Sequence, residues 1–320
     1  MVPESIDKPV TPLIVIVGPT AVGKTETAIQ LAERLHGEII SADSRLFYRG
    51  MDIGTAKPTQ ADRARVQHHL IDIVYPDQVI SLAMYQKAVQ GTITNIARNG
   101  HVPFLVGGTG QYIRAVVEAW DVPRTAPNPA LRLALNHWAK HIGPAEIHKR
   151  LAKLDPMAAS QIDYRNLRRT VRALEVIFTT GKLFSRQKRK SSISNFHSLI
   201  LGLDRPRPEL YDRIDTRIRL MLDAGFVEEV RDLLDKGYSP DLPAFSAIGY
   251  REIIAYLQDK ISLDEAVVLI KRHTRIFVRR QSNWFKRADP NIRWHTIGPG
   301  IVQEMELQIK EFLAGFNYKL

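Results

Sequence analysis

The sequence predicts an α/β protein in which a mostly parallel sheet is interrupted by a helical insertion. Short apolar runs alternate with helical periodicity in the first third of the chain, a pattern typical of parallel sheets. The helical pattern then continues without a convincing strand, and a strand-like run returns only at Leu199–Leu203. A chain of 320 residues is also long for one simple core. We therefore expect a core formed by residues 1–124 and 199–320, with an insertion at 125–198.

The elements of the first third follow from their residue patterns. Apolar, partly β-branched runs indicate strands at Leu13–Val17, Glu38–Ala42 and Pro103–Val106. Apolar residues at helical spacing indicate helices at Thr25–Leu35 and at Leu82–Ala97. Because strands and helices alternate, the strands are expected to pair in parallel.

The later elements follow from breaks as well as from periodicity. The proline-rich segment Asp121–Pro129 ends the first pattern. Helices are expected over Glu209–Leu234, with a break near Gly225, and over Asp264–Lys286, where an Asp-Pro pair follows. The polar, serine-rich segment Lys188–Asn195 predicts a mobile loop within the insertion.

The composition excludes several classes of protein. Hydrophobic residues make up 44% and charged residues 25% of the chain, which excludes a wholly disordered protein. No apolar run reaches the roughly 20 residues of a membrane helix. The chain has no cysteine, so disulfides, thiol nucleophiles and Cys-ligated zinc are excluded, and the ten histidines show no metal-binding spacing. Met1–Thr11 lacks an apolar signal region, so we expect a cytoplasmic protein, and we expect a monomer.

Basic residues are concentrated in two segments of a chain whose net charge is +11. Arg165–Lys190 holds nine basic residues and one acid, Glu175, and Lys271–Arg287 holds seven basic residues and no acid. Such blocks are either a surface for a polyanion such as nucleic acid or two solvated helix faces. Charge alone leaves both interpretations open.

Helical spacing gathers these cations on faces opposite to apolar residues. The first face comprises Arg165, Arg168, Arg169 and Arg172, opposite Leu167, Val171, Leu174 and Phe178. The second comprises Arg272, Arg275, Arg279 and Lys286, opposite Val267, Ile270, Phe277, Val278, Trp284 and Phe285. A guanidinium group can donate two hydrogen bonds to one phosphate, so both faces suit a nucleic-acid backbone.

A phosphate-binding motif follows the first predicted strand and precedes the first predicted helix. The motif G-x-x-x-x-G-K-[ST] is matched by Gly18, Pro19, Thr20, Ala21, Val22, Gly23, Lys24 and Thr25. The glycines let backbone N–H groups surround an oxyanion, the helix start adds a positive dipole end, and Lys24 adds a charge. Thr25 is the candidate ligand for Mg²⁺. The alternative is a glycine-rich turn that binds nothing.

The acid expected of a nucleotide hydrolase is absent from its usual place. The apolar strand Pro103–Val106 runs into Gly107-Gly108-Thr109, where a hydrolase would carry an acid that holds the metal. An acid instead follows the second strand, as Asp43. This placement favours a loop that binds a diphosphate leaving group over a loop that binds a nucleotide for hydrolysis.

These motifs and others occur in one order along the chain, and that order resembles the tRNA dimethylallyltransferase (isopentenyl-tRNA transferase) family. Besides the phosphate motif and Val106–Thr109, the matching residues are Asp43-Ser44, Tyr48, Met51–Pro58, Arg172–Val176, Ile248–Arg251, Arg280-Gln281 and Trp284. The run Asp52-Ile53-Gly54-Thr55-Ala56-Lys57-Pro58 is the most specific of them, and the resemblance extends from about Leu13 to Arg287. Leu46, Asn283 and Val22 depart from the usual residues of the family.

The resemblance implies a fold and a reaction. The fold would be a P-loop nucleoside-triphosphate-hydrolase-like core with a helical insertion. The reaction would transfer a dimethylallyl group from dimethylallyl diphosphate to N6 of the adenosine immediately 3′ of the anticodon, position 37 of tRNA. Asp43 would be the general base, Gly18–Thr25 would hold the diphosphate and Mg²⁺, Thr109 would act at the reacting end, and Arg217 would reach the diphosphate. The anticodon stem-loop of tRNA would contact Asp43, Ser44, Arg45, Leu46, Thr109, Arg132, Arg168, Arg169, Arg172, Ser246, Gly249, Tyr250, Arg251, Arg279, Arg280, Gln281, Trp284 and Lys286.

Each single-residue role has a structural alternative. Asp43 could cap a turn or helix, because Asp-Ser is also a capping pair. Arg217 could form a surface ion pair with Glu209, Asp212 or Asp215. Thr109 could be a turn residue. Trp284 and Phe285 fit a protein core better than a base-stacking platform, and Tyr250 fits either role.

Three other functions are possible, and each leaves a feature of the sequence unexplained. An adenylate isopentenyltransferase acting on AMP or ADP would not need the insertion with its arginine face or the second basic helix. A nucleic-acid-dependent ATPase or a small-molecule kinase would need the acid that is absent after Pro103–Val106. A non-enzymatic RNA-binding module would leave the intact phosphate motif without a role.

Overall fold

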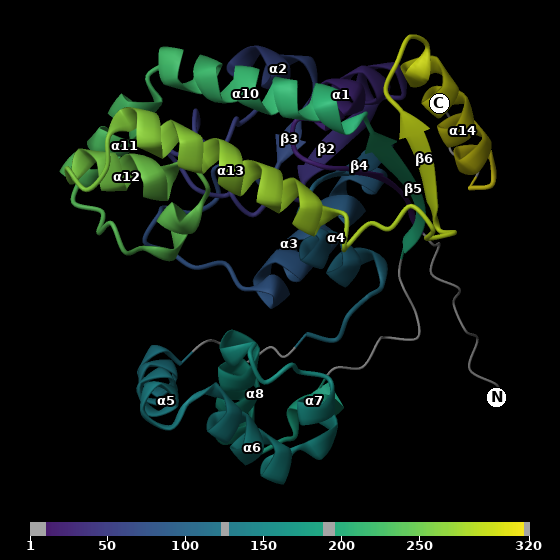
Figure 1. The fold of residues 1–320 in the computed structure, drawn as a ribbon. Helices are drawn as coiled ribbons and strands as arrows, with labels where there is room; N and C mark the ends of the chain where they lie inside the picture. Colours follow the sequence, from purple (N-terminus) through teal and green to yellow (C-terminus); the bar gives the residue numbers. More distant parts are fainter. Residues whose placement is uncertain (1–10, 123–127, 188–195, 317–320) are drawn as a thin grey trace, which may run out of the picture. The chain divides into compact units, whose positions relative to one another are not determined.

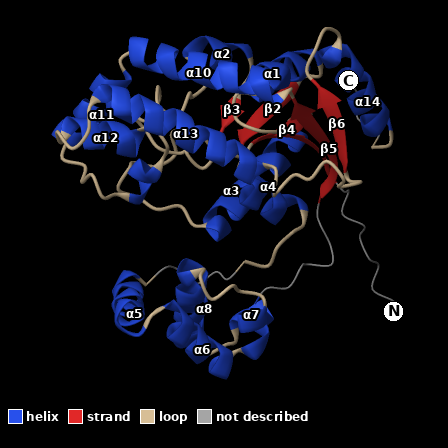
Figure 2. Cartoon of the chain, viewed as in Figure 1, coloured by secondary structure: helices blue, strands red, loops and turns tan. Residues whose placement is uncertain are grey.

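The structure, a computed structural model, describes residues 11–122, 128–187 and 196–316. Its sheet has six strands in the order β3-β2-β4-β1-β5-β6, and every strand pairing is parallel (Figures 1 and 2). The strands are β1 Thr11–Val17, β2 Gly37–Ser41, β3 His68–His69, β4 Val102–Gly107, β5 Phe196–Asp204 and β6 Ile292–Thr296. The predicted α/β class with a parallel sheet is therefore confirmed.

The described residues divide into two compact units, each with a hydrophobic core of its own. The described residues of the first unit are 11–80, 85–117 and 196–316, and they contain the sheet. Its helices are α1 Lys24–Arg34, α2 Gln60–Arg65, α3 Leu82–Arg98, α4 Gly110–Val117, α10 Arg207–Asp223, α11 Phe226–Asp235, α12 Tyr250–Leu257, α13 Leu263–Gln281 and α14 Ile301–Ala314, with the short 3-10 helix η1 Pro243–Ser246. We call this part the sheet unit.

The second unit, Ser81–Met84 with Glu118–Ser194, is called the helical unit. Its helices are α5 Pro129–Ile142, α6 Pro144–Leu154, α7 Pro156–Ser160, α8 Leu167–Thr180 and α9 Phe184–Gln187. Its described residues include no strand, and its core includes Leu135, Ile147, Leu151, Val171 and Leu174. The predicted mobile loop Lys188–Asn195 lies outside the residues that the structure describes.

The sheet brings three predicted sites to one edge. Strand β1 is fully buried from Leu13 to Val17, because it pairs with β4 on one side and β5 on the other. Val17 is in register with Gly107 of β4, and Ser41 of β2 is in register with Val106. The carboxyl ends of β1, β2 and β4 are therefore neighbours, as expected for the binding edge of a parallel sheet. The phosphate motif, Asp43 and Thr109 follow these three ends.

Several local predictions need correction. The later basic helix was expected to run to Lys286, but α13 ends at Gln281. Arg165 precedes α8, whose N-cap is Asn166, so Arg165 is not part of the arginine face of that helix. Phe178 and Phe277 are 52% and 38% exposed, whereas their spacing predicted burial.

Among the residues that the structure describes, no helix is both long enough and apolar enough to cross a membrane.

Candidate functional site

The phosphate motif forms a closed loop between β1 and α1. Gly18 and Gly23 have φ values of +152° and +117°, and Ala21, at +62°, is also left-handed. A Cβ atom at Gly18 would lie 2.5 Å from the Leu203 carbonyl oxygen, so only glycine fits there. Helix α1 begins at Lys24 without a side-chain cap on its N–H groups. Those N–H groups and the helix dipole make this end of α1 suited to an anion.

Lys24 is folded back against the loop that it closes. Its Nζ donates hydrogen bonds to the carbonyl oxygens of Gly18, at 3.0 Å, and Pro19, at 2.7 Å. Burial lowers the pKa of Lys24 from 10.5 to about 8, and nearby Asp43 raises it while Arg217 lowers it further. Near neutral pH the side chain is still a cation.

Asp43 lies just beyond β2 and opens a turn. Its Oδ1 accepts a hydrogen bond of 3.0 Å from the Arg45 N–H, so the capping interpretation is correct for one carboxylate oxygen. The turn is joined to the end of β4, because Thr109 Oγ1 accepts from the Ser44 N–H and the Thr109 N–H donates to Ala42. Asp43 and Thr109 are both half-buried. The structure therefore brings Asp43 and Thr109 together at one edge of the sheet, and their chemical roles stay predictions.

Arg217 of α10 reaches the phosphate loop. Its Nη1 donates to Thr20 Oγ1 at 3.5 Å, and its Nη2 donates to the Thr55 carbonyl oxygen at 3.3 Å. Burial lowers the pKa of Arg217, with Asp43 opposing that shift. Asp215 pairs with Lys271 and Arg275. No ion pair joins Arg217 to an acid within the described residues, so the alternative of a surface ion pair is not favoured.

These groups line one cavity of about 650 Å³ in the sheet unit. Its walls include the side chains of Lys24, Thr25, Asp43, Leu46 and Arg217. The Asp43 carboxylate thus shares a cavity with two cations and a helix start. Such a cavity can hold a di-anion beside its cations, with the Asp43 carboxylate within electrostatic range of both Lys24 and Arg217.

The donors present suit a Mg²⁺ ion that is shared with a phosphate ligand. Among the described residues, no three Asp, Glu or His side chains are close enough to hold a metal by themselves. Mg²⁺ usually keeps several waters and binds through substrate phosphates with few protein ligands. The Thr25 hydroxyl lines the cavity and is an oxygen ligand of the kind that Mg²⁺ accepts. The site therefore fits Mg²⁺ that binds together with a diphosphate.

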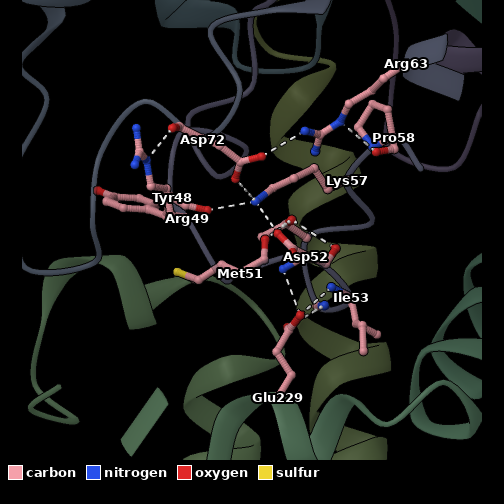
Figure 3. Close-up of polar contacts among 12 residues, drawn as sticks. Tyr48, Arg49, Met51, Asp52, Ile53, Lys57, Pro58, Arg63, Asp72 and Glu229 are labelled. Carbon is pink, nitrogen blue, oxygen red and sulfur yellow. Dashed lines mark hydrogen bonds and ion pairs between the residues drawn. The ribbon is translucent and has the colours of Figure 1, made fainter. Parts of the chain in front are cut away.

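Figure 3 shows polar contacts of the motif Asp52–Pro58. Residues Thr55–Pro58 of this motif also contribute to a wall of the same cavity. Lys57 is buried, and its Nζ donates to the Tyr48 carbonyl oxygen at 2.8 Å, to Asp72 Oδ1 at 2.6 Å and to Asp52 Oδ1. An ammonium group has three N–H donors, so all three are used within the protein. Although Lys57 is a cation beside the cavity, its role here is to hold the loop rather than to bind an anion.

Several predicted tRNA contacts in the sheet unit have other partners. Arg45 donates to the carbonyl oxygens of Pro243 and Ala244 and to Ser246 Oγ, so it anchors η1. Tyr250 is fully buried, and its ring packs against Phe226 and Phe245. Burial rules out the base-stacking role that the sequence had left open for Tyr250. The reason is that Gly249 ends the loop and Tyr250 starts α12, facing the core.

Gln281 has a structural position that its sequence did not reveal. It is buried, its Oε1 accepts from the Thr20 N–H at 2.9 Å, and its Nε2 donates to the Gly108 carbonyl oxygen at 3.1 Å. It therefore joins the phosphate loop to the end of β4, and direct contact with tRNA is not compatible with its burial. Trp284 is 39% exposed, and a Cβ at Gly110 would lie 2.3 Å from its side chain.

The remaining cations among the predicted tRNA contacts differ in availability. Arg132 and Arg172 both donate to Glu175, at 2.8 Å each, and the Glu175 side chain is fully buried. Burial raises the pKa of Glu175, but the hydrogen bonds from Arg172, Asn128 and Arg132 outweigh it and lower the pKa overall. By contrast, side chains that are exposed and have no partner among the described residues belong to Arg168, Arg169, Arg251, Arg279, Arg280 and Lys286.

Two arginines that the sequence did not indicate hold carbonyl oxygens of the phosphate loop, and one of them, Arg213, also lines the cavity. Arg205 Nε donates to the Val22 carbonyl oxygen at 2.8 Å, and Arg213 Nε donates to that of Ala21 at 2.9 Å. Arg213 is one helical turn before Arg217 on α10, and that spacing could have indicated a shared direction. Arg205 follows β5, and its role depends on the pairing of β5 with β1, which the sequence does not show.

Comparisons with known proteins agree with this geometry. A family model described as IPP transferase matches residues 46–288. The chain is 52% identical over 281 residues to the tRNA dimethylallyltransferase of Roseiflexus sp. (strain RS-1), covering 88% of this chain and 92% of that protein. A crystal structure of the full-length tRNA isopentenylpyrophosphate transferase of Bacillus halodurans is 39% identical, with a TM-score of 0.68 over 95% of this chain and 96% of that one. A eukaryotic dimethylallyltransferase acting on tRNA shares the fold at 24% identity, with a TM-score of 0.80 over 97% and 81% of the two chains.

The parallel sheet, the anion-binding loop after β1 and the nearby carboxylate together define an α/β protein of the P-loop class. The family model covers more than half of the chain, and relatives are about half identical over most of it. The chain belongs to the tRNA dimethylallyltransferase, or IPP transferase, family.

Proposed function

We propose that this chain transfers a dimethylallyl group from dimethylallyl diphosphate to N6 of the adenosine immediately 3′ of the tRNA anticodon, position 37. The products are N6-(dimethylallyl)adenosine and diphosphate. The observation that carries this proposal is the grouping of Asp43 with Lys24 and Arg217 around one cavity. The grouping supplies a proton acceptor and cations for a leaving diphosphate within one cavity.

On the adenosine side, the difficulty is a weak nucleophile. The lone pair of the exocyclic amine is delocalised into the ring, so attack on carbon is slow without a base. As the bond from N6 to the allylic carbon forms, a proton leaves N6 for the Asp43 carboxylate. One Asp43 oxygen is used by the turn, which orients the carboxylate. Thr109, joined to the same turn, is proposed to hold the reacting end in place.

On the diphosphate side, negative charge grows as the bond from carbon to oxygen breaks. The N–H groups at the start of α1, together with Lys24 and Arg217, are placed to stabilise that charge. Thr25 is proposed to hold Mg²⁺ together with the diphosphate, and a bound Mg²⁺ would neutralise charge on the leaving group. The adenine must leave its stack in the anticodon loop to reach Asp43.

For tRNA binding, the exposed cations of both units are the proposed contacts. They are Arg168 and Arg169 in the helical unit, and Arg251, Arg279, Arg280 and Lys286 in the sheet unit. Further proposed contacts are Ser44 and Leu46, which flank Arg45 in the chain, and Ser246, which contacts Arg45. We propose Arg132, Arg172 and Gln281 as residues that hold these surfaces in shape. We also propose that the chain acts as a monomer and that, because its substrate is tRNA, it is located in the cytoplasm.

The direct test is incubation of the protein with dimethylallyl diphosphate, Mg²⁺ and unmodified tRNA, followed by mass analysis of the nucleosides. The expected result is an adenosine that has gained one dimethylallyl group, at position 37 only. Replacing tRNA by AMP should give no product, and prenylated AMP would instead support an adenylate isopentenyltransferase.

The same preparation tests the remaining alternative. Strand β4 ends in Gly107 and is followed by Gly108 and Thr109 rather than by an acid, so ATP hydrolysis should be negligible with or without RNA. Robust RNA-stimulated ATP hydrolysis would overturn the transferase proposal in favour of an ATPase.

A further inference from the structure

Glu229 of α11 binds the backbone of the family's most specific motif (Figure 3). Its Oε2 accepts hydrogen bonds from the N–H groups of Asp52, at 2.8 Å, and Ile53, at 2.6 Å, and its Oε1 accepts from the N–H of Gly54 at 3.1 Å. The Tyr250 hydroxyl donates to the same Oε1 at 2.6 Å. Three consecutive N–H groups that converge on one carboxylate form an anion-binding nest, and here the anion belongs to the protein.

The nest fixes the turn that follows it. Within the turn, the Ala56 N–H donates to the Ile53 carbonyl oxygen, the Lys57 N–H donates to that of Asp52, and Thr55 Oγ1 donates to that of Met51. A Cβ at Gly54 would lie 2.1 Å from the Phe226 ring, so α11 packs directly on the turn. The turn therefore takes its position from α11, through the carboxylate and through this contact.

The same turn also holds Arg217. Its Thr55 carbonyl oxygen accepts a hydrogen bond from Arg217 Nη2, while Nη1 of the same guanidinium group reaches Thr20 of the phosphate loop. A guanidinium group is planar, so fixing one of its nitrogens fixes the direction of the others. Without the Thr55 carbonyl, the long Arg217 side chain would have more rotamers to lose when the diphosphate binds.

We propose that Glu229 is a positioning residue for the diphosphate site: its carboxylate fixes the Asp52–Thr55 turn, and that turn aims Arg217 at the diphosphate. This inference rests on the proposed function and adds a residue that does not touch the cavity. This role differs from general stabilisation of the fold, because the proposed effect of Glu229 on diphosphate affinity passes through Arg217. It also accounts for a carboxylate whose four described donors are all neutral and which no described cation pairs with.

The test uses the full chain and the variant Glu229→Gln. The amide replaces one carboxylate oxygen by an NH₂ group, which would oppose N–H or O–H donors in the nest. We expect the Kd for inorganic diphosphate in the presence of Mg²⁺, measured by calorimetry, to rise about 5- to 20-fold, and the Kd for tRNA to change less than twofold. The matched control is Glu228→Gln, on the same turn of α11, where the exposed carboxylate lies 3.8 Å from Arg231. It should leave both Kd values unchanged.

A double-mutant cycle decides whether the effect passes through Arg217. In an Arg217→Ala background, Glu229→Gln should cause no further loss of diphosphate affinity. Losses that multiply in the double variant, or an unchanged Kd in Glu229→Gln, would overturn the proposal. If Glu229→Gln does not fold, Tyr250→Phe removes one of the four donors and should raise the Kd about two- to threefold by the same route, and an unchanged Kd there would also overturn it. Failure of the wild-type chain to bind diphosphate would instead refute the proposed function.

Discussion

Asp43 uses one carboxylate oxygen to hold the turn that it opens, and its other oxygen is left for chemistry. A substitution can therefore test the two oxygens separately. Oδ1 accepts from the Arg45 N–H, and Oδ2 has no hydrogen-bond donor in the described part of the chain. An asparagine could keep the first contact with its own carbonyl oxygen, because Asn and Asp form such turns and caps comparably. It could not accept a proton near neutral pH.

Asp43→Asn should therefore separate binding from chemistry. We expect kcat to fall by about 10²–10⁴-fold, the usual contribution of general-base catalysis, with KM for tRNA little changed. Steady-state kinetics with tRNA and dimethylallyl diphosphate measure both constants. If kcat stays within about threefold of the wild type, Asp43 is only a turn residue, and the base must be sought elsewhere.

The lowered pKa of Lys24 predicts a pH-dependent affinity for diphosphate. Above pH 8 the free protein loses the Lys24 proton, and with it a positive charge at the site. Affinity for inorganic diphosphate should then fall by up to about tenfold per pH unit, relative to the variant Lys24→Arg, whose guanidinium stays protonated. Calorimetric titrations between pH 7 and 9.5 test this, and parallel profiles for the two proteins would contradict it.

The stability of the unliganded protein should change in the opposite direction. Between pH 8 and 10.5 the unfolded chain binds the Lys24 proton and the folded chain does not. The free energy of unfolding should therefore rise with pH across that window, compared with Lys24→Met, which has no such proton. Urea denaturation at several pH values measures the difference, and a fall with pH would show that Lys24 is not buried as a lone cation.

At this scale, the sequence predicts side chains that chemistry demands and misses those that only position others. Asp43, Lys24 and Thr109 follow from motifs at strand ends. Gln281 was assigned to RNA, because its partners Thr20 and Gly108 are some 170 residues or more away in sequence, and only the fold brings them together. Glu229 gave no signal, since the backbone N–H groups that it binds have no sequence signature.

Among the secondary-structure elements, α8 shows most clearly how one helix serves two purposes. Arg168 and Arg169 are exposed, whereas Arg172, one turn later, shares the buried Glu175 carboxylate with Arg132. The sequence predicted a single arginine face, because it could not show that Glu175 is buried. Tertiary packing therefore leaves Arg168 and Arg169 facing solvent and directs Arg172 toward the buried Glu175 carboxylate.

Arg168 and Arg169 should contribute to RNA affinity alone. In Arg168→Ala with Arg169→Ala, the slope of log K against log salt concentration should fall by roughly 0.7–0.9 for each phosphate that is no longer neutralised. The Tm and the affinity for diphosphate should stay unchanged. Filter binding of tRNA at several salt concentrations tests this, and an unchanged slope would mean that these arginines are only solvated.

Arg172→Ala should behave differently, because it removes a charged donor from a buried carboxylate. We expect a loss of about 1.5–3 kcal/mol in the stability of the helical unit, which urea denaturation would measure. The exposed Arg150, on α6, is a suitable control position for a change of charge alone. If the variant instead keeps its stability and the slope of log K for tRNA against log salt concentration falls, Arg172 binds RNA.

Long elements with strong patterns were predicted well, and short ones were not. Strand β1 and helix α1 were predicted to within about one or two residues, because buried apolar runs and a glycine loop mark their ends. Strands β3 and β6 were missed: β3 has two residues, and β6 alternates polar and apolar residues at the edge of the sheet. Helix α13 ends early, at Gln281, where the side chain contacts Thr20 and Gly108, and helical spacing cannot show such long-range contacts.

At the scale of the whole molecule, two cores in one chain predict two separable responses to a ligand. A diphosphate at about 100 times its Kd should stabilise the sheet unit by about 2.7 kcal/mol. Amide exchange of β1 and α1 should slow accordingly, by up to about 100-fold, whereas exchange in α6 and α8 should not change. Hydrogen-exchange mass spectrometry measures both in one experiment. Equal slowing in the two units would mean that they unfold together.

The position of β1 in the sheet also has a consequence for how the protein is made. This strand pairs in register with β5, whose first residue, Phe196, is synthesised about 180 positions after Thr11. At 5–20 residues per second, a ribosome needs roughly 10–40 s to bridge that interval. During this time strand β1, which is apolar from Leu13 to Val17, lacks its partner β5 on one side. The helices of the intervening segment depend on local contacts and can already form. Nascent chains of this protein should therefore need shielding from aggregation until translation has passed β5.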